Sequence, residues 1–210
     1  MRVGNAPIYD EGLATRVVFN AADDKTGMKR YIVTGAPGAG KTTMVRQLEL
    51  DGFSVVEEAA TDVIALSQAK GVAEPWTHPE FIDAIVSLQR IRELRSASVT
   101  GGVQFHDRSV VCTAALAEYL EFPRPQSLLQ ELERLKTQSI FQTKVIFLAN
   151  LGFVTRTEAR RISYEEAIRF EAIHERTYRD LGFEIVYIGA GSVLDRVREL
   201  KRVLSLGDLG

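Results

Sequence analysis

Short apolar runs alternate with longer segments of helical spacing along this chain. Five of the runs are rich in β-branched and aromatic residues and are predicted to be buried strands, at residues 31–34, 53–56, 103–107, 144–148 and 183–188. Between them, apolar residues recur three or four positions apart, as on one face of a helix. This alternation predicts an α/β fold in which a parallel five-stranded sheet carries helices on both faces.

Two of the predicted helices begin with a capping box, in which side chains at the first and fourth positions bond each other's backbone N–H groups. One box is Thr77 with Glu80, and the other is Ser163 with Glu166. The helix after Thr77 has an apolar stripe that is expected to face the core, formed by Phe81, Ile82, Ile85, Leu88, Ile91 and Leu94. A further helix at residues 127–136 is expected to turn four leucines inward, at Leu128, Leu129, Leu132 and Leu135.

A glycine-rich turn links the first predicted strand to the first predicted helix. It fits the pattern G-x-x-x-x-G-K-[ST] of a phosphate-binding P-loop. Glycines allow positive φ and bring several backbone N–H groups towards one anion, and the helix that follows aims its N-terminus at the same point. Lys41 is expected to bridge the terminal phosphates, and the Thr42 hydroxyl is expected to hold Mg²⁺. The residues predicted to contact the nucleotide are Gly35, Ala36, Pro37, Gly38, Ala39, Gly40, Lys41, Thr42 and Thr43.

Composition narrows the class of protein. The 210 residues are 45% hydrophobic and 26% charged, which is typical of a globular domain with ample material for a core. The formal net charge of −2 gives no indication of nucleic-acid binding, and no apolar run approaches the length of a transmembrane helix. A single cysteine, Cys112, excludes an internal disulfide and fits a reducing cytosol, so a cytoplasmic location is predicted.

The predicted organisation is one domain with a short extension. Residues 29–210 are expected to form a P-loop domain of nucleotide-kinase type, in which a basic, turn-rich segment at about 150–163 serves as a lid. Residues 1–28 are expected to be an N-terminal extension. Translation from Met28 would make this extension disposable, whereas a strand at residues 15–19 would add an edge to the sheet.

Charged side chains follow the strands at the edge where parallel sheets bind their ligands. Asp107 ends the third strand, where an acid would hold Mg²⁺ through water; a helix N-cap is the alternative role. Arg108 has the fork geometry to hold an anionic substrate or a carboxylate of the site, or it forms a structural ion pair. One of Glu57 and Glu58 is expected to accept a proton from an attacking hydroxyl, with Glu57 preferred as nearer the strand. The alternative is that both acids stabilise a helix dipole.

Arginines gather in the predicted lid. Arg156 and Arg160 share one helical face, and Arg161 follows directly. They are expected to close over the phosphates and neutralise charge in the transition state, and the alternative is a solvated charged face.

Three residues border the expected acceptor cleft. Trp76 has a ring that can stack on a ligand and Gln89 an amide that can bond one, with Arg92 nearby. Packing or surface positions are the alternative for these residues. His106 and His174 are expected to be structural histidines.

Taken together, these motifs resemble the NadR-like P-loop ATPase/kinase family, which is often grouped with AAA-type ATPase domains. The matching segments are residues 33–43, 55–60, 105–109, 156–161, 172–175 and 181–183. The family takes its name from a domain that phosphorylates nicotinamide riboside and is related in fold to nucleoside and nucleotide kinases. The resemblance covers the chain from residue 29 to about residue 205.

The resemblance also implies roles for individual residues. Asp107, Arg108 and Ser109 correspond to the acid-Arg-Ser motif of deoxynucleoside kinases, in which the acid lies near Mg²⁺ and the arginine near the reacting phosphate. The acid after the second strand, here Glu57 or Glu58, corresponds to the base of those enzymes. The loop at residues 189–192 would lie beside the nucleotide base.

Two functions fit these residues. The first is a small-molecule kinase that moves the γ-phosphoryl group of ATP to a nucleoside-like or other small acceptor, with Lys41 and the lid arginines as electrostatic stabilisers. ATP is the default nucleotide because the sequence has no Asn-Lys-x-Asp motif for reading guanine. The second is a switch that hydrolyses ATP or GTP and acts on a protein or lipid partner. A pocket lined by polar groups would favour the kinase, and an open or apolar groove would favour the switch.

Overall fold

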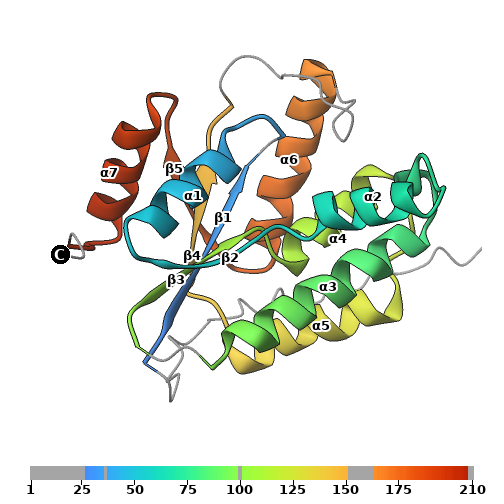
Figure 1. Cartoon of the computed structure of the whole chain (residues 1–210), viewed down its shortest axis with the longest axis horizontal. Coiled ribbons are helices and arrows are strands. Elements are labelled where there is room, and N and C mark those ends of the chain that lie inside the picture. The colour runs from blue at the N-terminus through green and yellow to red at the C-terminus, as the bar shows by residue number, and fades with distance from the viewer. Residues whose placement is uncertain (1–26, 36, 99–100, 151–162, 208–210) are drawn as a thin grey trace, which may run out of the picture.

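The computed structural model describes residues 27–35, 37–98, 101–150 and 163–207. Within them the chain forms β1 (Lys29–Gly35), α1 (Lys41–Leu50), β2 (Ser54–Val56), α2 (Ala60–Ala69), the 3₁₀ turn η1 (Pro75–Thr77), α3 (Glu80–Ser96), β3 (Val103–Asp107), α4 (Val110–Tyr119), α5 (Gln126–Gln138), β4 (Lys144–Leu148), α6 (Tyr164–Asp180), β5 (Glu184–Ile188) and α7 (Val193–Val203). The strands form one parallel sheet in the order β2-β3-β1-β4-β5 (Figure 1). The predicted parallel five-stranded sheet is confirmed.

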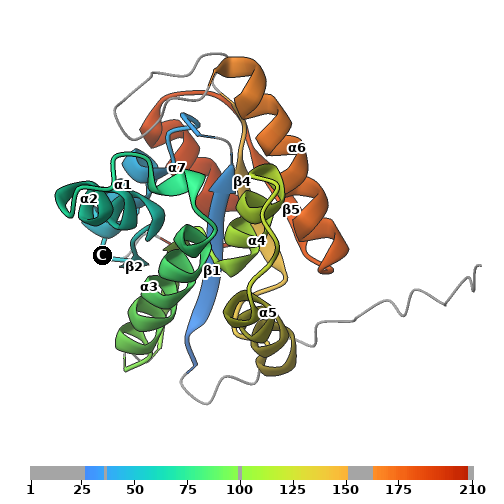
Figure 2. The ribbon, with the colours of Figure 1, turned by 90° about the vertical axis from the view of Figure 1, so that its right-hand side faces the viewer.

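Helices cover both faces of the sheet, as predicted. α1 and α7 pack on one face, whereas α4, α5 and α6 lie on the other, with α3 against α4 and α5 (Figure 2). β1 shows the alternation on which this layering depends. Ile32 points into the core under α4 and α6, while Tyr31 and Val33 point into the core under α1 and α7. Because both faces are buried, the strands have the nearly continuous apolar sequences from which they were predicted.

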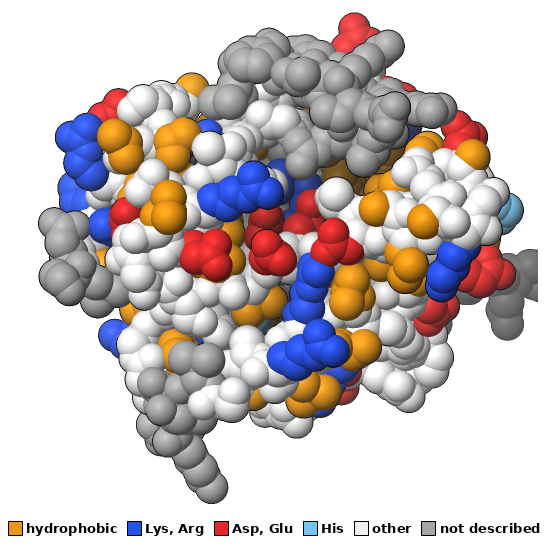
Figure 3. All heavy atoms as spheres, viewed as in Figure 1, with side chains coloured by type: hydrophobic (Ala, Val, Ile, Leu, Met, Phe, Trp, Pro, Cys, Tyr) orange, Lys and Arg blue, Asp and Glu red, His pale blue; other side chains and the backbone are white. Residues whose placement is uncertain are grey.

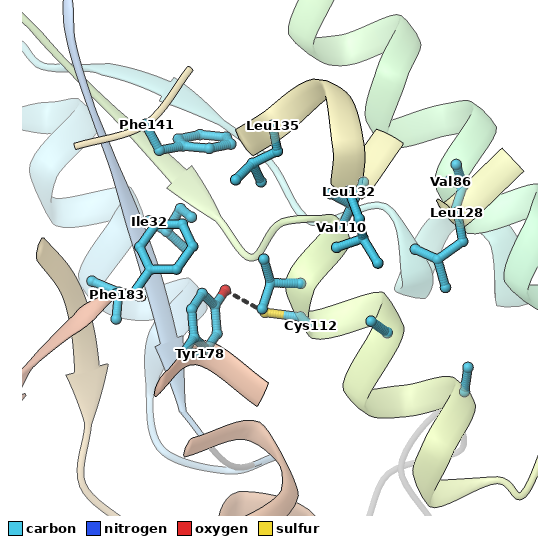
Figure 4. Packing of buried hydrophobic residues seen from close by; sticks show 14 of the residues in the cluster. Ile32, Val86, Val110, Cys112, Leu128, Leu132, Leu135, Phe141, Tyr178 and Phe183 are labelled. Atoms are coloured by element: carbon cyan, nitrogen blue, oxygen red, sulfur yellow. Dashed lines mark hydrogen bonds between the residues drawn. The ribbon is translucent and has the colours of Figure 1, made fainter. Parts of the chain in front are cut away.

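A buried polar cluster fixes α4 against α6 and β1. The Tyr178 hydroxyl lies 3.1 Å from Cys112 Sγ (Figure 4) and 3.0 Å from Ser109 Oγ, and Thr34 Oγ1 lies 3.2 Å from the same sulfur. Burial raises the pKa of the Tyr178 phenol well above its ordinary value, so the hydroxyl stays protonated. These contacts hold the start of α4, which follows β3 directly, in a fixed position relative to α6.

One of the two predicted capping boxes is present. At the start of α6, Ser163 Oγ accepts from the Glu166 N–H at 3.2 Å, and the Ser163 N–H donates to Glu166 Oε2 at 2.6 Å. The box predicted at Thr77 and Glu80 is wrong. Thr77 ends η1, where its hydroxyl bonds a carbonyl of the same turn, and Pro79 precedes α3. Proline has a φ suited to the first turn of a helix, so this helix begins without a side-chain cap.

The second half of α3 turns a polar face inward. Ile91 and Leu94, which the apolar stripe predicts to be buried, are 44% and 55% exposed. Arg92 instead bonds the backbone that follows β2, and Glu93 forms an ion pair with an arginine of α5. Leu129 of α5 is also exposed, contrary to prediction. Ion pairs between helices therefore decide which face of these helices is buried.

The surface shown in Figure 3 mixes charges. Acidic and basic side chains lie side by side on this face, its hydrophobic side chains are scattered, and no extended basic area occurs among its coloured residues. In the described ranges, no helix is both long and apolar enough to cross a membrane. Residues 1–26 lie outside these ranges, so the N-terminal extension and the domain boundaries stay predictions.

Candidate active site

The glycine-rich turn joins the end of β1 to the start of α1. Gly35, Gly38 and Gly40 have φ values of 134°, 84° and 79°, which side chains larger than glycine rarely adopt. At Gly35 a Cβ would also lie 2.4 Å from the carbonyl oxygen of Leu148 in β4. The turn therefore depends on glycine at these positions. Since α1 begins at Lys41, the N–H groups that its first turn leaves unbonded lie next to this loop.

Lys41 is buried at the head of α1, with 5% of its surface exposed. Its Nζ donates to the carbonyl oxygen of Gly35 at 3.0 Å, so the side chain crosses the mouth of the turn. Thr42 and Thr43 follow it and are exposed. An ammonium held over glycine-lined N–H groups, with a hydroxyl beside it, is the arrangement that binds phosphate.

Arg196 of α7 supports the same turn from a distant part of the chain. Its side chain is 5% exposed, and Nη1 donates to the carbonyl oxygen of Ala39 at 2.7 Å. Nε and Nη2 are buried without a hydrogen-bond partner in the part of the chain that is described, and burial lowers the pKa of the guanidinium. Sequence analysis did not identify Arg196. The sequence does contain one sign of a buried role for Arg196, because this charged residue lies on the apolar face of its helix, between Val193 and Leu200.

Asp107 is the last residue of β3 and is paired in register with Val33 of β1. It is therefore buried at the carboxyl-terminal end of the sheet, beside the strand that leads into the glycine-rich turn. The N-cap of α4 is Ser109, whose Oγ accepts from the Val111 N–H at 3.2 Å. The alternative that Asp107 caps this helix is consequently wrong.

Arg108 follows Asp107 in a left-handed backbone conformation, with φ of 72°, that is rare outside glycine. Its Nε lies 2.7 Å from Glu58 Oε1, and its Nη1 lies 3.2 Å from His174 Nε2. Burial lowers the pKa of the guanidinium, but the Glu58 carboxylate, with smaller effects of Cys112 and Asp107, outweighs burial, so the pKa lies above its ordinary value. Arg108 thus stays charged in a largely buried position.

The two acids after β2 point in different directions. Glu58 pairs with Arg108 and lines the cavity described below, whereas Glu57 is exposed and borders a smaller hollow. Arg92 bonds the carbonyl oxygens of both and pairs with Asp62, so it anchors this backbone and does not line the larger cavity. The geometry favours Glu58 over Glu57 as the acid that faces a ligand.

A cavity of about 370 Å³ adjoins the Arg108–Glu58 pair. It is lined mainly by apolar and aromatic side chains, which are Pro37, Ala60, Ile64, Trp76, Phe81, Ile85, Cys112, Leu116, Tyr119, Leu120 and Phe170. Its polar lining consists of Glu58, Thr61, Gln89, Arg108, Thr113 and Glu166. Thr113 Oγ1 donates to Gln89 Oε1 at 2.9 Å, which leaves the Gln89 NH₂ group to bond a ligand. Its volume and lining are those of a small-molecule site, typically about 300–1,000 Å³.

The two buried histidines differ in their surroundings. His106 Nε2 lies 2.9 Å from Gln104 Oε1, and burial lowers the pKa of His106 to about 3, which fits the structural role expected of it. His174 is instead in contact with Arg108. Burial, together with the nearby charge of Arg108, lowers the pKa of His174 well below its ordinary value, so the imidazole is neutral.

Comparison with known proteins agrees with this geometry. The sequence profile of AAA domains matches residues 30–196, which include the turn, Glu58, Arg108, His174 and Arg196. The chain belongs to the AAA domain family. No curated protein sequence matches it significantly.

Solved structures place this AAA domain among the P-loop kinases in fold. A NadR structure in complex with NAD and AMP-PNP superimposes with a TM-score of 0.62 at 17% identity, over 86% of this chain and 51% of that chain. NadR in complex with NR superimposes with a TM-score of 0.62 at 18% identity, over 86% of this chain and 52% of that chain. Deoxyadenosine kinase from M. mycoides with bound dATP superimposes with a TM-score of 0.55 at 13% identity, over 84% of this chain and 99% of that chain. The chain spans about half the length of the NadR chains that it matches. The predicted AAA-type ATPase domain family is confirmed, and the predicted likeness to NadR is confirmed in fold.

The remaining site residues of this AAA domain stay predictions. Arg156, Arg160 and Arg161 of the expected lid lie outside the described residues, as does Ala36 of the turn. α6 begins shortly after the lid segment and brings Glu171 near the P-loop. Burial, followed by the neighbouring Glu175 carboxylate, raises the pKa of Glu171, which sequence analysis did not identify.

Proposed function

We propose that this AAA domain is a Mg-ATP-dependent kinase that transfers the γ-phosphoryl group of ATP to a small, nucleoside-like acceptor. The observation that carries the proposal is a shared boundary: Pro37 of the P-loop, Glu58 and Arg108 line one cavity. A phosphate on the P-loop and a molecule in the cavity would therefore meet at the Arg108–Glu58 pair. The mainly apolar lining of this cavity is the feature expected of a switch, but the side chains that line it together with Pro37 include the charged pair Glu58 and Arg108, which favours the kinase.

The chain offers a suitable group for each part of Mg-ATP. The N–H groups of the P-loop and the Lys41 ammonium take the negative charge of the phosphates. The Thr42 hydroxyl and the Asp107 carboxylate are oxygen donors of the kind that Mg²⁺ prefers. A bound Mg²⁺ would neutralise charge that builds up on the phosphates during transfer.

Glu58 and Arg108 would act on the reacting atoms. The acceptor oxygen attacks the γ-phosphorus, its proton passes to the Glu58 carboxylate, and the bond to the β,γ-bridging oxygen breaks with its electron pair leaving on ADP. Arg108, which is paired with Glu58, would place positive charge beside the transferring group. Arg156 and Arg160 of the expected lid would add positive charge to neutralise the phosphates. Glu57, which was preferred from the sequence as the base, does not line this cavity.

The cavity lining supports an acceptor with a flat ring. Trp76, Phe81, Tyr119 and Phe170 supply aromatic walls, and the Gln89 amide supplies a hydrogen bond for a ring edge. The related folds are consistent with this class, because NadR has been solved with NR and the M. mycoides kinase with dATP. The hydroxyl of a nucleoside sugar would then point towards Glu58.

A turnover assay tests the proposal. ADP formation from Mg-ATP is measured alone and with nucleosides, nicotinamide riboside and nucleoside monophosphates, with Lys41→Ala as the blank. Stimulation by a member of the panel, absent in the blank, would establish the kinase and identify its substrate class. Slow hydrolysis that no acceptor changes would contradict the kinase and favour the switch.

A further inference from the structure

His174 connects the wall of the acceptor cavity to Arg108. Its imidazole is fully buried in α6, with Nδ1 3.0 Å from the carbonyl oxygen of Phe170 and Nε2 3.2 Å from Arg108 Nη1. The Phe170 ring packs edge-on against the imidazole, with ring centroids 4.1 Å apart, and also lines the cavity. The imidazole therefore touches one group that would meet the acceptor and one that would meet the phosphate.

These two contacts admit a single tautomer of His174. A carbonyl oxygen only accepts hydrogen bonds, so Nδ1 must carry the proton that goes to Phe170. A guanidinium only donates, so Nε2 must be unprotonated to accept from Arg108. A neutral imidazole with its proton on Nδ1 satisfies both partners, and protonation of Nε2 would replace this bond by repulsion between two cations.

Arg108 needs such support because its position is strained. Its φ of 72° is unfavourable for a side chain with a Cβ, so surrounding contacts must hold the residue in place. Glu58 contacts Nε from the side of β2, and His174 contacts Nη1 from the side of α6. Two contacts at different nitrogens fix the plane of the guanidinium, whereas the Glu58 contact alone leaves it free to turn.

We propose that His174 is a positioning residue for the reaction: its unprotonated Nε2 orients the Arg108 guanidinium towards the transferring phosphoryl group. The role rests on the proposed kinase function, since it acts through Arg108. The orientation of Arg108 itself is independent of that function and can be measured without turnover. Two measurements therefore separate a failure of this inference from a failure of the proposed function.

The first measurement is NMR of the ¹⁵N-labelled full chain at pH 7. Long-range ¹H–¹⁵N correlations of the histidine rings, assigned by loss in His174→Gln, are expected to show Nδ1 protonated and Nε2 unprotonated. The Arg108 Nε–H, assigned with Arg108→Lys, is expected to exchange with water at least about tenfold faster in His174→Phe than in wild type. His174→Gln, whose amide oxygen replaces Nε2 as an acceptor, is expected to restore slow exchange. A protonated Nε2, or unchanged exchange in His174→Phe, would overturn the inference.

The second measurement is steady-state kinetics with the acceptor that the panel identifies. His174→Phe is expected to lower kcat roughly 10- to 100-fold with little change in the KM for ATP, because a misplaced catalytic group costs rate more than ground-state binding. His174→Gln should recover most of kcat. Thr177→Val is the matched control, since among the described residues this buried hydroxyl, one turn along α6, bonds only the Ile173 carbonyl of its own helix. An equal loss of kcat in Thr177→Val would assign the effect to helix stability and reject a positioning role.

If no acceptor supports turnover while the NMR result holds, the proposed function fails and the orientation of Arg108 by His174 stands.

Discussion

Arg108 and Glu58 form an ion pair, with 2.7 Å between Nε and Oε1, that joins the ends of β3 and β2. The second carboxylate oxygen of Glu58 accepts from Thr61 Oγ1 at 2.8 Å. Both side chains line the cavity that reaches Pro37 of the P-loop. The pair and the P-loop residue Pro37 therefore share the lining of one cavity. The position of the pair makes the roles of these two residues testable separately from nucleotide binding.

Glu58→Gln is expected to lower kcat by about 10²- to 10⁴-fold, because the amide keeps the size of the side chain but cannot take a proton. Stabilisation of the protein by Mg-ATP should persist, since the P-loop is unchanged. Thermal unfolding and turnover are measured on the same preparation. Glu57→Gln is the control and should keep activity within about threefold. If Glu57→Gln loses more activity than Glu58→Gln, the assignment of the base is wrong.

Lys41→Ala is expected to abolish productive binding of Mg-ATP while leaving the fold intact. The ammonium supplies charge that no other described residue of the turn carries, whereas its packing contribution at the start of α1 is small. Circular dichroism checks the fold, and the shift of the unfolding temperature with added Mg-ATP checks binding. A shift as large as that of the wild type would refute the P-loop assignment.

Arg196→Met is expected to weaken nucleotide binding by about tenfold, equivalent to about 1.4 kcal/mol, because the P-loop loses the hydrogen bond to Ala39. Stability should stay the same or rise, since the variant no longer buries a charge for which the described residues supply no anionic partner. Calorimetric titration with a non-hydrolysable ATP analogue measures the affinity. Arg198→Met changes an exposed arginine of the same helix and serves as the control. Equal affinity in both variants would leave Arg196 without a role in the P-loop.

Thr113→Val is expected to raise the KM for the acceptor about fivefold to tenfold. The substitution keeps the shape of the side chain but removes the hydroxyl that fixes the Gln89 amide, so the NH₂ group loses its orientation towards the cavity. The KM for ATP is the internal control and should change little, because ATP binds at the P-loop. A change in the KM for ATP alone would mean that Gln89 does not face the acceptor.

Acid is expected to destabilise the protein partly through His106. Burial, with a smaller effect of Arg30, lowers the pKa of His106 to about 3, whereas an unfolded histidine titrates near 6.5. The unfolded state therefore binds the proton more tightly, so the stabilising effect is complete above pH 6.5 and is lost as the pH falls towards 3. Between pH 6.5 and 5 the resulting loss in the free energy of unfolding is about 2 kcal/mol. Urea unfolding at pH 7.5 and 5 measures the loss, which should be smaller in His106→Gln. Equal losses in both proteins would exclude His106 as a source.

The strands and the P-loop follow from local sequence because their physical causes are local. β1 is buried on both faces, so its sequence is an apolar run. The backbone of the turn has positive φ at Gly35 and Gly40, so both positions require glycine. The shared edge of the sheet is also predictable, because parallel strands bring their carboxyl ends together. This rule brought Asp107, Arg108 and the pair Glu57 and Glu58 together as candidates, with Glu57 preferred as the base.

Contacts between distant segments could not be predicted in the same way. The meeting of Arg108 with His174 depends on how α4 packs on α6, and no local pattern encodes it. The inward polar face of α3 depends on ion pairs with α5, so the apolar spacing of Ile91 and Leu94 was misleading. The choice between Glu57 and Glu58 was open for a similar reason: only the packed structure shows which of two adjacent acids contacts Arg108.

The fate of the γ-phosphate tests the central claim most directly. Mg-ATP labelled in the γ-phosphoryl group is incubated with the wild-type chain and the acceptor that best stimulates ADP formation, and ³¹P NMR or chromatography identifies the labelled product. The label is expected on the acceptor, in an amount equal to the ADP formed, with inorganic phosphate as a minor product. Label found only in inorganic phosphate, whatever the acceptor, would contradict the claim that the cavity and the P-loop form one kinase site.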